Sequence, residues 1–118
     1  RRALTVLLSA ARGRAVLDAL AAGSAITLVA SRPLTHATLQ LKGARAERVP
    51  VSAAHKATSL RCVTAFGREL AALGYGEAAA ATLATILPAD ALAALRFAPD
   101  IVFDQTPGPR AGTVLARA

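Results

Sequence analysis

The chain has 118 residues, of which 54% are hydrophobic, and its 14 basic and 7 acidic residues give a formal charge of +7. This length buries one core but is short for two, so we expect a single domain over residues 1–118. Cys62 is the single cysteine, so an intrachain disulfide is excluded. A structural zinc site is excluded as well, because the sequence has no cluster of Cys and His residues.

The positive charge does not have the pattern of a nucleic-acid-binding surface. Basic residues are scattered singly, and Arg1-Arg2 is the one adjacent pair. Aromatic residues, on which bases stack, make up only 3% of the chain. Nucleic-acid binding would require a contiguous basic face, so we keep it as the weakest alternative.

The first third of the chain predicts a strand, a helix and a second strand. Residues 3–8 (ALTVLL) form an apolar run typical of a buried strand, and Ser9 is the predicted N-cap of a helix over residues 10–22. Residues 25–31 (AITLVAS) are rich in β-branched side chains and end before a proline. They predict a central strand.

A strictly alternating strand follows over residues 38–42 (TLQLK), and the short connection from residue 31 indicates a hairpin. Alternation places three polar side chains on one face of this strand: Thr38, Gln40 and Lys42. Gly43 is expected to form a bulge or kink, after which residues 44–51 continue as strand.

Ser52 is the predicted N-cap of a long helix that Gly74 ends. Its apolar stripe recurs at helical spacing: Ser59, Val63, Phe66, Leu70 and Leu73. We expect Cys62, at the edge of this stripe, to behave as a small buried hydrophobic residue.

The last third predicts an alanine-rich helix over residues 77–87, a strand over 92–97 that runs into 99–103, and loop chemistry over 104–112. Strands joined by hairpins, with two unequal helical insertions, favour an antiparallel α+β domain. Closure into a barrel would cover the edges of its sheet.

Three stretches in order resemble a compact branch of the pyridoxamine 5'-phosphate oxidase-like family: 25–33 (AITLVASRP), 35–43 (THATLQLKG) and 97–112 (FAPDIVFDQTPGPRAG). The order of elements also fits, and the resemblance covers nearly the whole chain. It implies an FMN-binding split barrel: an antiparallel split β-barrel with flanking helices that forms a homodimer with FMN at the interface. The resemblance further implies a small-molecule redox substrate.

The resemblance assigns cofactor-binding roles to particular residues. In the family, the strand that carries the matched glutamine lies beside the flavin, so the Gln40 amide is expected near FMN. Arg32, Thr35 and Lys42 carry donors suited to phosphate or ribityl oxygens, and Thr38 shares the face of Gln40. Gln105 belongs to a proline-containing turn (DQTPGP) that would cap a ring system with little loss of entropy on binding.

The sequence departs from the family pattern at both ends. Family members carry a basic upstream strand that grips the phosphate, and this chain starts after it, so we expect one or more N-terminal strands to be missing. The C-terminal Trp and Arg that hold the pyridoxal-type substrate have no counterpart here. The resemblance therefore implies flavin binding rather than pyridoxamine phosphate oxidation, and it leaves the substrate and the electron donor unassigned.

Two functions from different classes stay open at this point: an FMN-dependent oxidoreductase, and a non-catalytic flavin-binding, haem-binding or dimerisation module with the same fold. His36 is expected to be a solvated turn residue, and no catalytic or metal-binding residue is predicted. The sequence contains no apolar run of about 18 to 20 residues that is free of charged and helix-breaking residues, so no membrane span is predicted. No signal peptide is recognisable, so we expect a cytoplasmic protein.

Overall fold

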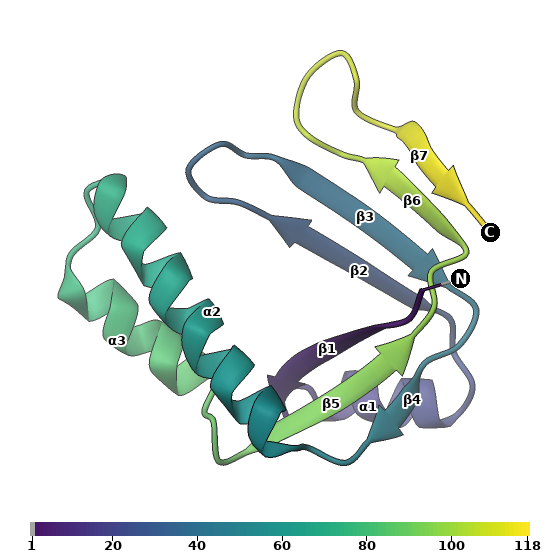
Figure 1. Cartoon of the computed structure of the whole chain (residues 1–118), viewed down its shortest axis with the longest axis horizontal. Helices are drawn as coiled ribbons and strands as arrows, with labels where there is room; N and C mark the ends of the chain where they lie inside the picture. The colour runs from purple at the N-terminus through teal and green to yellow at the C-terminus, as the bar shows by residue number, and fades with distance from the viewer. Residues whose placement is uncertain (1) are drawn as a thin grey trace.

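Seven strands and three helices make up residues 2–118, the part of the chain that the computed structural model describes. The fold is α+β, and every strand pairing in it is antiparallel (Figure 1). In chain order the elements are β1 (Leu4–Ser9), α1 (Arg14–Ala21), β2 (Ile26–Ser31), β3 (Thr38–Gly43), β4 (Glu47–Val49), α2 (Ala53–Ala72), α3 (Glu77–Ile86), β5 (Leu92–Phe97), β6 (Ile101–Asp104) and β7 (Thr113–Arg117). The strands form two sheets, and no strand pairing among the described residues joins them into a closed barrel.

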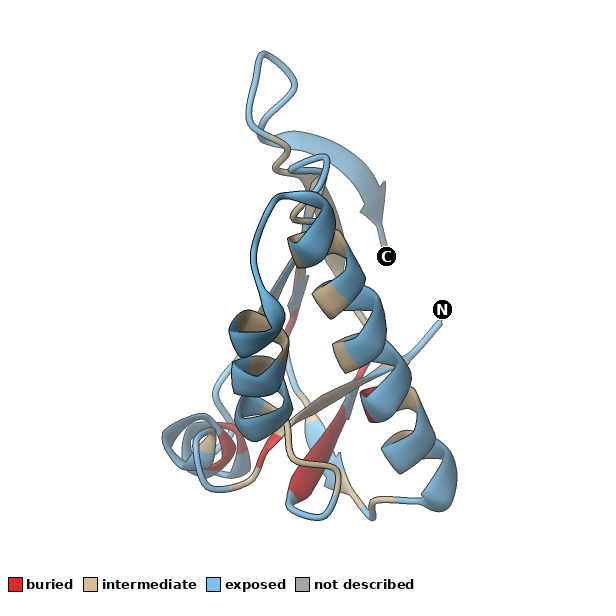
Figure 2. Cartoon of the chain, turned by 90° about the vertical axis from the view of Figure 1, so that its left-hand side faces the viewer, coloured by how far each residue is buried: buried red, intermediate tan, exposed pale blue. Residues whose placement is uncertain are grey.

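The three-stranded sheet has the order β1-β5-β4 and contains most of the core. Its central strand β5 is buried at every position except Arg96. Helix α1 packs Leu17 and Leu20 into the same cluster as three β5 side chains and one from β2: Ala93, Leu95, Phe97 and Ile26. Figure 2 shows the buried segments gathered around β5 and α1.

The four-stranded sheet has the order β2-β3-β6-β7, and its strands β2 and β3 form the predicted hairpin, in which Ser31 faces Thr38. The prediction of a central strand over residues 25–31 is wrong, because β2 lies at the edge of this sheet. Its apolar content has another cause: Ile26 and Leu28 contact the core from one face of the strand.

The chain passes between the two sheets three times: through α1, directly after Gly43, and directly at residues 98–100. The prediction that residues 44–51 continue as strand is therefore wrong except at Glu47–Val49, which pair with β5 in the other sheet. The two direct crossings touch each other, since the Asp100 N–H donates to the Lys42 carbonyl at 2.7 Å and the Asp100 carboxylate accepts the Ala44 N–H at 2.7 Å. Gly43 is needed there, because a Cβ at this position would lie 2.8 Å from the Phe97 ring.

The long helix is confirmed: Ser52 caps α2 in a reciprocal box with His55, and Gly74 follows its end with φ +93°. The predicted cap at Ser9 is wrong. Ser9 is the last residue of β1, its Oγ accepts the Arg12 N–H at 3.2 Å, and α1 begins only at Arg14.

Cys62 is exposed rather than buried, because the described part of α2 buries only Ser59 fully. Strand β7 was not predicted, since all five of its residues are exposed and carry no alternating pattern. Among residues 2–118, no helix has both the length and the apolar character needed to cross a membrane.

Candidate functional site

The outer face of the four-stranded sheet, called the open face below, gathers most of the predicted site residues. Residues opposite one another in antiparallel strands point to the same side, so the register defines its rows. From one end of the sheet to the other, the rows are Ser31–Thr38, then Val29–Gln40–Phe103–Val114, then Thr27–Lys42–Ile101–Arg117. The opposite face carries Leu28 and Leu41, which pack against the core.

Gln40 and Gln105 meet on this sheet. The Gln105 side-chain N–H donates to the Gln40 side-chain oxygen at 3.3 Å, and both residues are half-buried. The Gln105 backbone N–H donates to the Thr38 carbonyl at 2.9 Å, and the Thr38 N–H donates to the Thr106 Oγ1 at 3.0 Å. The structure thus brings together Thr38, Gln40 and Gln105 by extending the pairing of β3 beyond the end of β6.

The turn after β6 is held by Asp104. Its carboxylate accepts the Thr106 N–H at 2.9 Å, and hydrogen bonds from Thr106 hold the pKa of the Asp104 carboxyl below its usual range. Arg110, 4.0 Å away, lowers that pKa further, while desolvation opposes the shift. The Gly112 N–H closes the loop on the Asp104 carbonyl at 2.8 Å.

The last row of the open face is cationic. The Lys42 ammonium lies 5.5 Å from the centre of the Phe103 ring, in reach of a cation–π contact. Arg117 ends the same row on β7 and also lines a hollow of about 370 Å³ together with Arg2. The sequence analysis did not predict Phe103 and Arg117 as site residues. Phe103 reaches the open face through the pairing register of β6 with β3, and Arg117 lies on β7, whose sequence has no alternating pattern.

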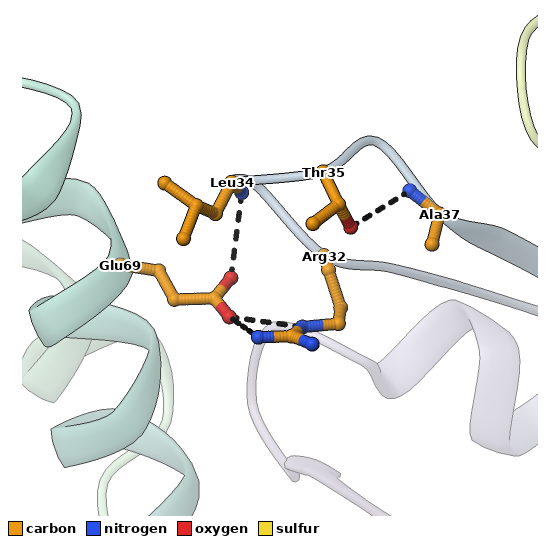
Figure 3. Close-up of polar contacts among 5 residues, drawn as sticks. All are labelled: Arg32, Leu34, Thr35, Ala37 and Glu69. Carbon is orange, nitrogen blue, oxygen red and sulfur yellow. Dashed lines mark hydrogen bonds and ion pairs between the residues drawn. The ribbon is translucent and has the colours of Figure 1, made fainter.

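Arg32 and Thr35 do not join this group. They lie in the β2–β3 loop beside α2, where Arg32 Nε donates to the Glu69 carboxylate at 2.9 Å (Figure 3). Glu69 also accepts the Leu34 N–H at 3.4 Å, and the bond from Arg32 is the main reason why the pKa of Glu69 is lowered. Thr35 Oγ1 accepts the Ala37 N–H at 3.3 Å, so both predicted phosphate ligands are engaged within the protein.

The turn histidine is placed as expected. His36 is exposed and adopts a left-handed backbone with φ +59°, the one such non-glycine residue in the described chain.

The titratable groups that share the open face are the cations Lys42 and Arg117. The central row, apolar except for Gln40, lies between two polar ends of the face: the hydroxyls of Ser31 and Thr38 with the nearby Gln105 amide, and the cations Lys42 and Arg117. This arrangement suits a flat, amphipathic anion.

Another hollow, of about 670 Å³, lies in the other half of the molecule and is lined by the end of α1, by Arg45 and by the Arg96–Glu47 pair. None of the predicted site residues lines it, whereas the open face carries Thr38, Gln40 and Lys42 and the contact of Gln40 with Gln105, and is the stronger candidate for that reason. No family model, curated protein or solved structure matches this chain. The function of the open face is therefore inferred from its own residues.

Proposed function

We propose that the chain binds FMN on the open face and is an oxidoreductase-like protein related to pyridoxamine 5'-phosphate oxidase, with a second copy of the chain covering the flavin. The observation that carries the proposal is the apolar row centred on Gln40 beside the cationic row of Lys42 and Arg117. A bound flavin supplies hydride or electron transfer, and the protein supplies binding and orientation.

The residues of the open face fit the chemical groups of FMN. Val29 and Phe103 flank Gln40 in its row and offer apolar contact to a flat ring. The Gln40 side-chain nitrogen donates to no protein group in residues 2–118, which leaves it to donate to a ring carbonyl or nitrogen. Lys42 and Arg117 are exposed cations suited to a phosphate.

The surface of the chain supports a homodimer. Its accessible area is 7611 Å², about 1,600 Å² more than the roughly 6,000 Å² expected of a folded monomer of this mass. Its radius of gyration is 15.2 Å, against about 13.5 Å for a compact domain of this length. A standard interface needs about 800 Å² from each partner. On the open face, Val29 and Val114 are 55% and 39% exposed.

The proposal extends to the fold. The two antiparallel sheets, joined at the crossings after Gly43 and at Asp100, are the two parts of a split barrel in this interpretation. The open face is then the part of the barrel that the partner copy and the flavin complete.

Titration of the purified protein with FMN, followed by flavin fluorescence, tests the proposal. Gln40→Ala removes the central hydrogen bond and should weaken binding by roughly 1 to 2 kcal/mol. Thr35→Ala, in the β2–β3 loop away from the central row, is the matched control and should leave the affinity unchanged. Absence of binding by the unaltered chain at tens of micromolar FMN would contradict the proposal.

The two lysines of the chain provide a second test. Lys42→Gln should weaken FMN binding by about 0.5 to 1 kcal/mol, the value of an exposed ion pair, and should reduce its salt dependence. Lys56→Gln removes the same charge from α2 and should change neither property. Equal effects of the two substitutions would place the phosphate elsewhere.

The oligomeric state and the activity are measured separately. Val29→Lys should convert a dimer to a monomer in analytical ultracentrifugation without unfolding the chain, because Val29 lies outside the core. Oxidation of a reduced nicotinamide by the FMN-loaded protein, with a range of acceptors, identifies an oxidoreductase. Flavin binding without turnover would favour a non-catalytic binding module.

A further inference from the structure

A hollow of about 500 Å³, called the apolar groove below, lies between the α2–α3 hairpin and the end of β1. Leu7 and Leu8 line it from β1, Phe66 from α2, and Leu83 and Ile86 from α3. No residue of the open face lines it. Its volume falls within the range of about 300 to 1,000 Å³ that is typical of ligand-binding pockets.

The groove leaves large apolar side chains in water. Phe66 is 38% exposed and Ile86 is 43% exposed, although they line a concavity rather than a scattered outer surface. Contact between apolar surface and water is unfavourable in proportion to its area. A ligand with an apolar body would displace that water from both helices and from the β1 residues at once.

The one charged residue in the lining is Arg12. Its backbone N–H donates to Ser9 Oγ at 3.2 Å, which fixes the turn that carries it, while its guanidinium has no ion pair or hydrogen bond within residues 2–118. No acidic residue lines the groove. The adjoining start of α1, where Gly13 provides no side-chain cap, adds to the positive potential.

We propose that the apolar groove binds a medium-chain aliphatic carboxylate, with its alkyl chain along Phe66 and Ile86 and its carboxylate at Arg12. The charge decides the class of ligand, because a lone cation beside an apolar cavity favours an anionic head over a neutral or cationic one. The site is independent of flavin binding, since the two surfaces share no residue.

The single thiol of the chain reports on occupancy. Cys62 lines the groove and is exposed, so its reaction with N-ethylmaleimide is measured by mass spectrometry. Decanoate, decanol and decyltrimethylammonium are compared, each below the concentration at which it forms micelles. All three have the same alkyl length, and protection of Cys62 should decrease from the carboxylate to the alcohol to the cation.

Two substitutions identify the residues responsible. Arg12→Gln should remove an advantage of about three- to fivefold of decanoate over decanol, the size expected for an exposed charge pair. Arg48→Gln, an exposed β4 residue outside the lining, should keep that advantage. Ile86→Trp should fill the groove and abolish protection by every probe while the circular dichroism spectrum is unchanged.

Three results would overturn the proposal. The first is an absence of protection by decanoate. The second is a head-group preference that Arg12→Gln leaves intact. The third is protection of Cys62 that rises with protein concentration in the absence of any probe, since a second copy of the chain would then cover the groove.

Discussion

Strand β5 and strand β3 both run through the interior of a sheet, yet their surroundings differ sharply. β5 is buried at Leu92, Ala93, Ala94, Leu95 and Phe97, whereas β3 is fully buried only at Gly43. A sheet covered on both faces contributes stability, whereas the proposed function assigns the binding groups to the sheet with the open face. Mutations can test this proposed division of tasks directly.

The largest expected effect is loss of the core at β5. Leu95 is 3% exposed within the main cluster, so Leu95→Ala should lower the free energy of unfolding by about 2 to 5 kcal/mol. Val29→Ala, on the open face, should change it by no more than about 0.5 kcal/mol in dilute monomer. Urea denaturation measures both. Similar losses would show that the two sheets are equally important for stability.

The crossing between the sheets comes next. Gly43→Ala places a methyl group against the Phe97 ring and the Ala98 carbonyl, and should destabilise the fold by about 1 to 3 kcal/mol. Gly67→Ala, in the interior of α2 with only Ala80 at an ordinary contact distance, should instead stabilise it by about 0.5 to 1 kcal/mol. Thermal melting distinguishes the two outcomes, because Gly43→Ala should lower the melting temperature and Gly67→Ala should raise it. An unchanged melting temperature in Gly43→Ala would mean that the crossing is loosely packed.

A smaller and local effect is expected where the open sheet meets α2. Glu69→Gln removes the charge that binds Arg32, so the Arg32 and His36 amides, which bond within the loop, should exchange with deuterium faster. Global stability should change little, because the Arg32 side chain is 63% exposed and screened by solvent, although that of Glu69 is 18% exposed. Arg32→Gln should give the same pattern, and unchanged exchange in both variants would show that the loop is ordered without the pair.

The smallest effect is expected from acid. Because the pKa of Asp104 is lowered in the folded protein, its stabilisation is present above the unfolded value of about 3.9 and is lost as pH falls through the lower folded value. The Thr106 amide signal in NMR should therefore titrate with a midpoint below that of an ordinary aspartate. Asp104→Asn should abolish this titration, and a midpoint at or above 3.9 would contradict the assigned cause.

Local patterns predicted the elements that depend on local chemistry. The β2–β3 hairpin, the Ser52 cap and strand β5 each follow from residues adjacent in sequence. The wrong prediction for β2 concerns pairing over a long distance, because its edge position is decided by β6, which arrives much later in the chain. The Ser9 cap is a local exception, since Ser9 ends β1 and its Oγ accepts the Arg12 N–H before α1 begins.

The candidate site divides in the same way. Alternation along β3 was enough to place Thr38, Gln40 and Lys42 on one face. The resemblance singled out the turn that carries Gln105, but its contact with Gln40 was not predicted. Arg32 and Thr35 were grouped with them by the resemblance and by the donor chemistry of their side chains. Their actual partners depend on where α2 lies, which no local pattern encodes.

The pairing of β1 with β5 sets Leu4 opposite Phe97 and so has a consequence for the order of folding. Every helix and the whole β2–β3 hairpin lie between these two strands in the chain, and closing so long a loop costs more entropy than closing a hairpin. The hairpin of the open sheet can therefore form first, with Leu28 and Leu41 uncovered until β5 arrives. The cost of loop closure therefore predicts that β5, the most buried strand of the finished molecule, pairs late in folding.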